Sequence, residues 1–98
     1  MAAGEHLYIV AYDIADRVRW RKVFRAMNGY GRWVQLSVFQ CRLTARRRAA
    51  MSARLEAIIH ARNDHVLIFD LGPADTVEPV AESLGKGFTP IRREAIII

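Results

Sequence analysis

Cysteine is nearly absent from this sequence, since Cys41 stands alone among 98 residues. One cysteine excludes an internal disulfide framework, and its apolar neighbours predict a small buried side chain in a reducing compartment. No stretch approaches the roughly 20 apolar residues that a bilayer crossing needs, and the first residues lack the basic region and apolar run of a signal peptide. These absences predict a cytoplasmic protein with no membrane partner.

Acidic residues are almost missing from the middle of the chain. Between residues 17 and 62, twelve Lys and Arg side chains accompany a single acid, Glu56, which gives this stretch a net charge of +11. The stretches before and after it each carry a net charge of −3. Thirteen of the fifteen basic residues are Arg, which binds phosphate through two donors and stays charged when partly desolvated. This segregation predicts a nucleic-acid partner.

The length and a hydrophobic content of 52% predict one domain over residues 1–98. Its first strand is expected at residues 7–14, where LYIVAYDI is β-branched and aromatic with little polarity, as in a central strand covered on both faces. Asp16 can cap a following helix over residues 17–28, where apolar side chains recur at helical spacing between arginines.

The next segment alternates apolar and polar side chains, but the alternation changes phase near Ser37. This break predicts either two short antiparallel strands, at residues 33–37 and 38–43, or one long kinked strand. Thr44 can then cap a second helix over residues 45–62. Three arginines in its first turn oppose the helix dipole, which is better explained if an anion binds there.

The apolar run HVLIFDL at residues 65–71 predicts another strand, which completes the order βαββαβ. This order is typical of an α+β, ferredoxin-like fold with a four-stranded antiparallel sheet and both helices on one face. The core would span about residues 1–73, with residues 74–98 as an extension. Within that extension, residues 74–90 fit a short helix or an irregular strand, whereas residues 91–98 predict a strand that pairs with a second subunit.

Four segments carry a resemblance to a known family over essentially the whole chain: YIVAYDI with its terminal aspartate, RVRWRKVF, RWVQLSVFQCRLT and HVLIFDLG. They resemble CRISPR-associated protein two. The resemblance implies a homodimer of ferredoxin-like protomers in which each C-terminal strand extends the sheet of the partner. It also implies that the aspartate at the end of the first strand, here Asp13, faces its symmetry mate across the dimer axis.

For activity, the resemblance implies a divalent metal, usually Mg²⁺, and cleavage of phosphodiesters in single-stranded RNA or double-stranded DNA. It further implies that the dimer bridges two integrase dimers during spacer acquisition. Paired Asp13 carboxylates suit Mg²⁺, which prefers one or two carboxylates together with water and phosphate oxygens. The alternative is that Asp13 only caps the strand or the following helix.

Two further residues are candidate accessories to the Asp13 site. Asp16 could assist the metal or cap the helix, and Ser37 could contact phosphate or water or simply occupy the turn. The three histidines show no metal-ligand spacing, and none lies near Asp13 in the sequence, so they are interpreted as structural.

Seven arginines on the two helices are the expected phosphate contacts, which would position a duplex without reading its sequence. A catalytically silent scaffold for DNA is therefore the alternative to a nuclease. A ferredoxin-like RNA-binding module is disfavoured, because the middle strands lack the aromatic motif that stacks bases, and only Tyr30 and Trp33 are candidates for stacking. The seven arginines are Arg17, Arg19, Arg21, Arg25, Arg46, Arg47 and Arg48.

Overall fold

The computed structural model describes residues 4–85 of the chain. Four strands and two helices follow one another in the predicted order βαββαβ. The strand predicted at residues 91–98 lies outside the described residues. The elements are β1 (His6–Asp13), α1 (Arg17–Met27), β2 (Gly31–Gln35), β3 (Val38–Leu43), α2 (Ala45–Ile58) and β4 (His65–Pro73).

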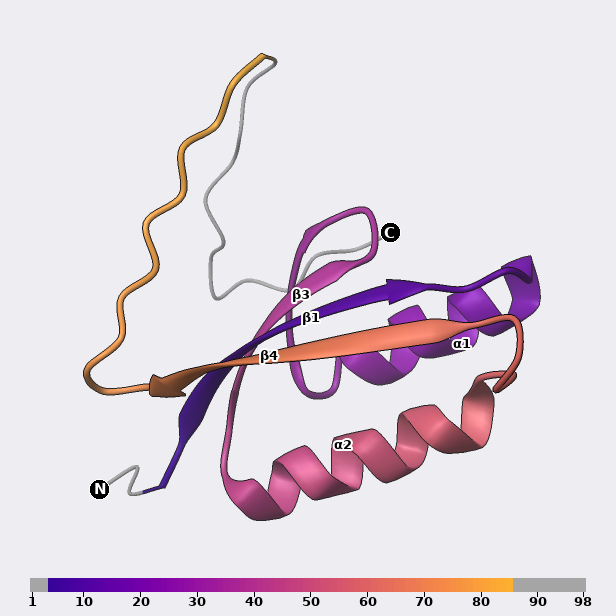
Figure 1. Cartoon of the computed structure of the whole chain (residues 1–98), viewed down its shortest axis with the longest axis horizontal. Helices are drawn as coiled ribbons and strands as arrows, with labels where there is room; N and C mark the ends of the chain where they lie inside the picture. The colour runs from indigo at the N-terminus through magenta and orange to yellow at the C-terminus, as the bar shows by residue number, and fades with distance from the viewer. Residues whose placement is uncertain (1–3, 86–98) are drawn as a thin grey trace.

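The strands form one antiparallel sheet in the order β2-β3-β1-β4, and both helices lie on the same side of it (Figure 1). This arrangement confirms the predicted α+β, ferredoxin-like fold. β1 is central and hydrogen-bonded on both sides, whereas β4 is an edge strand whose outer side is unpaired within the described residues. The end of β1 and the start of β4 therefore lie side by side.

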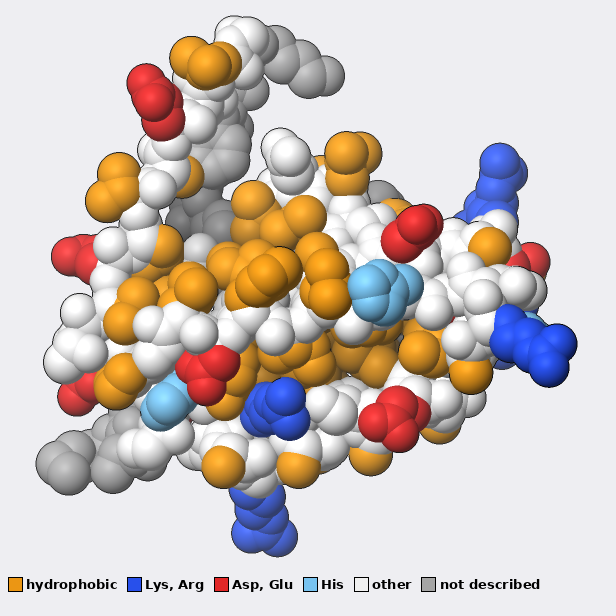
Figure 2. All heavy atoms as spheres, in the orientation of Figure 1, with side chains coloured by type: hydrophobic (Ala, Val, Ile, Leu, Met, Phe, Trp, Pro, Cys, Tyr) orange, Lys and Arg blue, Asp and Glu red, His pale blue; other side chains and the backbone are white. Residues whose placement is uncertain are grey.

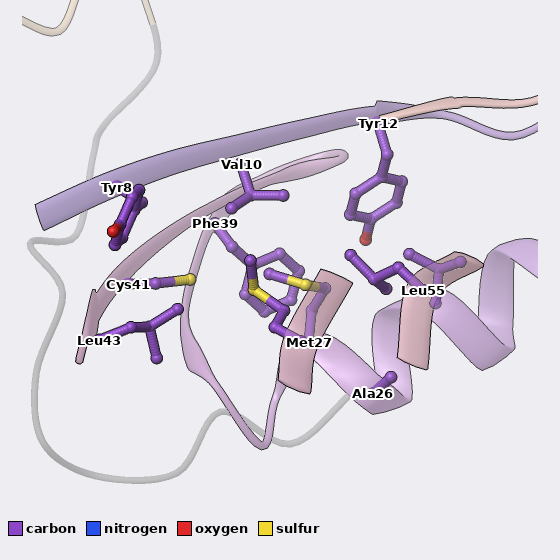
Figure 3. Packing of buried hydrophobic residues seen from close by; sticks show 11 residues of the cluster. Tyr8, Val10, Tyr12, Ala26, Met27, Phe39, Cys41, Leu43 and Leu55 are labelled. Atoms are coloured by element: carbon purple, nitrogen blue, oxygen red, sulfur yellow. The ribbon is translucent and has the colours of Figure 1, made fainter. Parts of the chain in front are cut away.

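The core fills the space between the sheet and the helices (Figure 3). Successive side chains of a strand point to opposite faces, so every second residue of β1 enters this core. Tyr12 points from β1 toward Leu55 of α2, and its hydroxyl has no hydrogen-bond partner among the described residues. Burial raises the pKa of the Cys41 thiol to about 12, in agreement with the buried cysteine predicted from the sequence.

The remaining strand residues point to the face of the sheet that no helix covers, which we call the open face. Ile9, Ala11 and Asp13 of β1 lie opposite Phe69, Leu67 and His65 of β4, respectively. The side chains of Leu67, Phe69 and Leu71 are exposed, although they are apolar. Figure 2 shows hydrophobic side chains gathered over β1 and β4.

The two predicted strands before α2 are confirmed, and no single kinked strand is formed. β2 and β3 meet in a tight turn at Leu36 and Ser37, with a register shift between Trp33 and Gln35. Leu36 has a left-handed φ of 42°, and its carbonyl oxygen accepts a 2.9 Å hydrogen bond from Nε1 of Trp33. The phase change in the sequence is thus a hairpin turn.

The capping residues in the sequence predicted where each helix begins more accurately than the sequence predicted where each helix ends. Asp16 and Thr44 cap α1 and α2 as predicted, each accepting a hydrogen bond from the backbone N–H three residues later. α2 stops at Ile58 rather than at residue 62, because Ile59 is extended and the chain then turns between His60 and Asp64.

β4 continues two residues beyond the predicted end at residue 71, and the N–H of Ala74 still bonds to the carbonyl of Glu5. Residues 74–76 form a turn, and no helix or strand follows up to residue 85 (Figure 1). The helix considered for residues 74–90 is therefore not found in its described part. The chain instead continues without regular structure, and residues 81–84 line a hollow together with Val34 and Gln35 of β2.

Candidate functional site

Asp13 lies at the exposed end of β1, on the open face. Its last ladder partner is His65, the first residue of β4. Within residues 4–85, the Asp13 carboxylate accepts no side-chain or backbone hydrogen bond and forms no ion pair. An exposed carboxylate with free oxygen lone pairs remains able to bind a cation or a water molecule.

His65 is the histidine that the sequence could not place beside Asp13. Fifty-two positions separate the two residues, and only the antiparallel register of β1 and β4 makes them direct neighbours. Residues directly opposite in such a pair have Cβ atoms about 4.5–5.5 Å apart and share a face. The imidazole is therefore a second polar group at this end of the open face, where sequence interpretation had assigned it only a structural role.

The predicted accessory residues lie close to the end of β1, but both have structural partners. Asp16 accepts the N–H of Arg19 at 2.9 Å, which is the helix-capping role. The carbonyl of Ser37 accepts the N–H of Tyr12 at 3.0 Å, and its hydroxyl accepts Nε1–H of Trp20 at 2.9 Å. Ser37 thus ties the β2–β3 turn to the residue before Asp13, while its hydroxyl proton stays available as a donor.

Asp64 lies beside this site, and the sequence alone did not single it out. Its buried carboxylate accepts backbone N–H groups from Ala15 at 2.9 Å and from His60 at 2.7 Å. It also pairs with Arg19, whose Nε lies at 2.7 Å and whose Nη2 lies at 3.2 Å. The Arg19 hydrogen bond, aided by the two backbone donors, holds the pKa of Asp64 well below its usual range.

The seven predicted phosphate-binding arginines fall into two groups. Arg19 is held by Asp64, and Arg47 donates to the carbonyl of Gly29 at 2.8 Å while its guanidinium lies 5.1 Å from the centre of the Tyr30 ring. In the part of the chain that the structure describes, the others are exposed and form no ion pair. These five are Arg17, Arg21 and Arg25 on α1 and Arg46 and Arg48 at the start of α2.

The five unengaged arginines occupy the helical layer, whereas Asp13 lies on the open face. Arg17, Arg21 and Arg25 follow one another at four-residue spacing, so they form a single row along α1. Such a row can follow a phosphate backbone, and its contacts carry no sequence information.

The aromatic candidates for base stacking have structural partners too. Tyr30 and Trp33 pack against the core, Tyr30 under Arg47 and Trp33 with its ring edge-on to Phe24 at 6.3 Å. Trp20 and Phe24 stack at 5.3 Å, as expected for core residues. Tyr30 and Trp33 are therefore partly buried and contact other residues of the molecule.

A metal would find few protein ligands in one copy of this chain. Residues 4–85 contain no group of three or more His, Cys, Asp or Glu side chains able to hold an ion together. Asp70 lies toward the other end of the sheet, paired with His6 at 2.8 Å. The free carboxylate of Asp13 fits a hard cation that keeps most of its water ligands, such as Mg²⁺.

None of the helices in residues 4–85 is both long enough and apolar enough to span a bilayer.

Comparisons with known proteins agree with this architecture. Residues 6–77 match the family model of CRISPR associated protein Cas2. The chain is 61% identical to CRISPR-associated endoribonuclease Cas2 1 of Rhodospirillum rubrum, over 97% of this chain and 93% of the relative. It is 54% identical to CRISPR-associated endoribonuclease Cas2 of Geobacter sulfurreducens, over 96% and 99% of the two chains. The crystal structure of Streptococcus pyogenes Cas2 at pH 6.5 superposes with a TM-score of 0.65, at 30% identity over 76% of this chain and 99% of that one.

Proposed function

This chain belongs to the Cas2 family of CRISPR-associated proteins, and from this we propose that it is a dimeric, metal-dependent endonuclease that acts in spacer acquisition. The single observation that carries the proposal is the placement of Asp13. Its free carboxylate lies at the end of a central strand, on an open face lined by exposed apolar side chains. A second copy packed on that face would bring two Asp13 residues together.

The apolar open face supports the homodimer. Leu67 and Phe69 keep 44% and 50% of their surfaces exposed, although each lies in the middle of a strand. Soluble proteins cover such contiguous apolar surface with a partner, and a self-complementary patch does so through two-fold symmetry. In this arrangement the C-terminal residues 91–98 would add a strand to the sheet of the partner, as the resemblance implies.

The catalytic part of the proposal assigns Mg²⁺, or another divalent metal, to the paired Asp13 carboxylates. When bound, the metal would polarise the phosphoryl group and lower the pKa of a bound water. The protein would supply the carboxylates, fix their backbone through β1, and offer His65 as a hydrogen-bonding group beside them. The free arginines of α1 and α2 would bind phosphates of the nucleic acid away from the cleaved bond, because they lie in the helical layer and Asp13 lies on the open face.

Single-stranded RNA is the proposed substrate, because the two bacterial relatives described above are named endoribonucleases. Double-stranded DNA is the other outcome of the test. The experiment is cleavage of labelled single-stranded RNA and duplex DNA with Mg²⁺ or with EDTA, by the unaltered protein and by Asp13→Asn. Asp75→Asn is the matched control, since it removes the same charge from an exposed turn.

We expect cleavage to need both Mg²⁺ and Asp13, with Asp13→Asn slower by at least about 100-fold and Asp75→Asn unchanged. The nuclease proposal fails if Asp13→Asn cuts as well as the unaltered protein, because the activity would then come from a contaminant or another site.

The second candidate function is a scaffold that holds protospacer DNA and bridges integrase dimers. It is favoured by the five arginines on α1 and α2 that form no ion pair within residues 4–85, and by the presence of only one carboxylate, Asp13, at this end of β1 on the open face. Duplex binding without any cleavage would select this function. Affinity that does not fall with salt would contradict it, because phosphate contacts release counterions.

A further inference from the structure

Asp64 joins three segments of the chain through one buried carboxylate. It lies between α2 and β4, and its side-chain oxygens bind the loop after β1 at Ala15, the turn after α2 at His60 and the first turn of α1 at Arg19. Only 8% of the residue is exposed to solvent. A buried carboxylate satisfied by two backbone donors and one guanidinium tolerates little movement of any of them.

We call the Asp64 carboxylate together with its three partners, Ala15, His60 and Arg19, the clamp. The clamp is connected to Asp13 both along β1 and through β4. Ala15, whose N–H is held, lies two residues after Asp13, and Asp64 itself comes directly before His65, the ladder partner of Asp13. Each residue between Asp13 and Ala15 contributes only two freely rotating backbone dihedrals, so holding the Ala15 N–H limits how far the Asp13 backbone can move. The backbone of Asp13 is thus fixed by the ladder before it and by the Asp64 carboxylate after it.

The same carboxylate also holds a cation in place. Arg19 lies in the first turn of α1, six residues after Asp13. Its Nε lies 2.7 Å from Oδ2 of Asp64. Without the charge on Asp64, the guanidinium would be released and the first turn of α1 would no longer be held to the loop after β1.

We propose that Asp64 is a positioning residue for the Asp13 site: it fixes the backbone after Asp13 and, through Arg19, ties that backbone to the first turn of α1. This inference rests on the proposed function of Asp13. Asp64 contacts neither substrate nor metal, and it acts through Ala15 and Arg19. Supporting residues of this kind change metal affinity or activity by about 10- to 100-fold when they are replaced.

The test is Asp64→Asn, which preserves the size of the side chain but removes its charge and one acceptor. We expect kcat for RNA cleavage with Mg²⁺ to fall at least about tenfold while KM stays within about twofold, because the arginines that hold the phosphates are unchanged. Mn²⁺ affinity, measured by calorimetry without substrate, should fall in parallel. This second readout does not depend on turnover.

Val23→Ala is the stability-matched control, since it removes buried core volume in α1 without touching the clamp. Below its unfolding temperature, it should keep kcat and Mn²⁺ affinity. If both variants lose activity only in proportion to the fraction unfolded, Asp64 is merely structural and the proposal is overturned.

Arg19→Gln keeps the test decisive if Asp64→Asn does not fold, because it leaves both backbone bonds to Asp64 in place. Since one of the three partners of the Asp64 carboxylate is lost, we expect a smaller fall in Mn²⁺ affinity than for Asp13→Asn. No fall at all would contradict the proposal.

The failure of the proposed function can be distinguished from the failure of the positioning role. If Asp13→Asn itself leaves Mn²⁺ affinity and cleavage unchanged, the proposed function fails; if Asp13 matters and the Asp64 and Arg19 variants do not, only the positioning role fails.

Discussion

Gly31 shows how closely two strands approach at a single residue. It is the first residue of β2 and the ladder partner of Cys41 in β3. A Cβ atom at this position would overlap Sγ of Cys41 and the backbone carbonyl of Gln40. Neither atom can withdraw easily, because Cys41 is buried and Gln40 belongs to the sheet.

We expect Gly31→Ala to lower the free energy of unfolding by about 1–3 kcal/mol, the usual cost of overpacking a filled core. Urea denaturation followed by circular dichroism measures this change. The control is Gly29→Ala, whose Cβ would lie 3.3 Å from the carbonyl oxygen of Ala26 and needs only a small adjustment. An equal loss in both variants would show that the contact with Cys41 and Gln40 does not explain the effect, because the lower chain entropy of alanine by itself stabilises the fold.

At the residue scale, the sequence predicted local partners and missed distant ones. Asp16 was predictable as a helix cap because its partner, the N–H of Arg19, lies three residues away. Asp64 was not, because the donors at Arg19 and Ala15 lie 45 and 49 residues away. Its role depends on how β4 returns beside β1, which no local pattern encodes.

At the scale of elements, the order and type of the strands and helices followed from periodicity, whereas their ends did not. The β-branched segments and the phase change near Ser37 gave the βαββ portion directly. The end of α2 depends on the turn stabilised by Asp64, and the end of β4 depends on a bond between Ala74 and Glu5. Both are tertiary contacts between parts of the chain that are far apart in the sequence.

Three consecutive arginines at the start of α2 have different surroundings. Arg47 is anchored to Gly29 and Tyr30, while Arg46 and Arg48 are exposed and form no ion pair within residues 4–85. We therefore expect the double variant Arg46→Gln, Arg48→Gln to weaken duplex binding at every DNA sequence. The slope of log affinity against log salt should fall by roughly two, about one for each lost phosphate contact.

Arg47→Gln is the matched control for that prediction. It should leave the salt slope nearly unchanged and lower the unfolding temperature instead, because it removes a hydrogen bond and a cation–π contact inside the molecule. Fluorescence anisotropy over a salt series, together with thermal unfolding, measures both quantities. If Arg47→Gln changes the slope as much as the double variant, Arg47 contacts phosphate and its internal partners are exchangeable.

For the whole molecule, the decisive feature is that the predicted phosphate-binding arginines lie in the helical layer, whereas exposed apolar side chains lie on the open face. The open face carries Asp13 with Leu67 and Phe69 beside it, and Arg32 and Arg42 lie on the same face over β2 and β3. Two copies joined through their open faces would leave both helical layers outward. Nucleic acid could then bind to the outside while two Asp13 carboxylates meet at the centre.

This arrangement predicts that dimerisation and cleavage fail together. Leu67→Glu with Phe69→Glu puts two like charges on the open face, whose burial would cost several kcal/mol without partners. We expect this variant to sediment as a monomer in analytical ultracentrifugation and to lose Mg²⁺-dependent cleavage. Val18→Glu, at an exposed apolar residue of α1, should remain dimeric because it lies in the helical layer. A Leu67, Phe69 variant that stays dimeric would show that the open face is not the interface, and one that cuts as a monomer would show that a single Asp13 is enough.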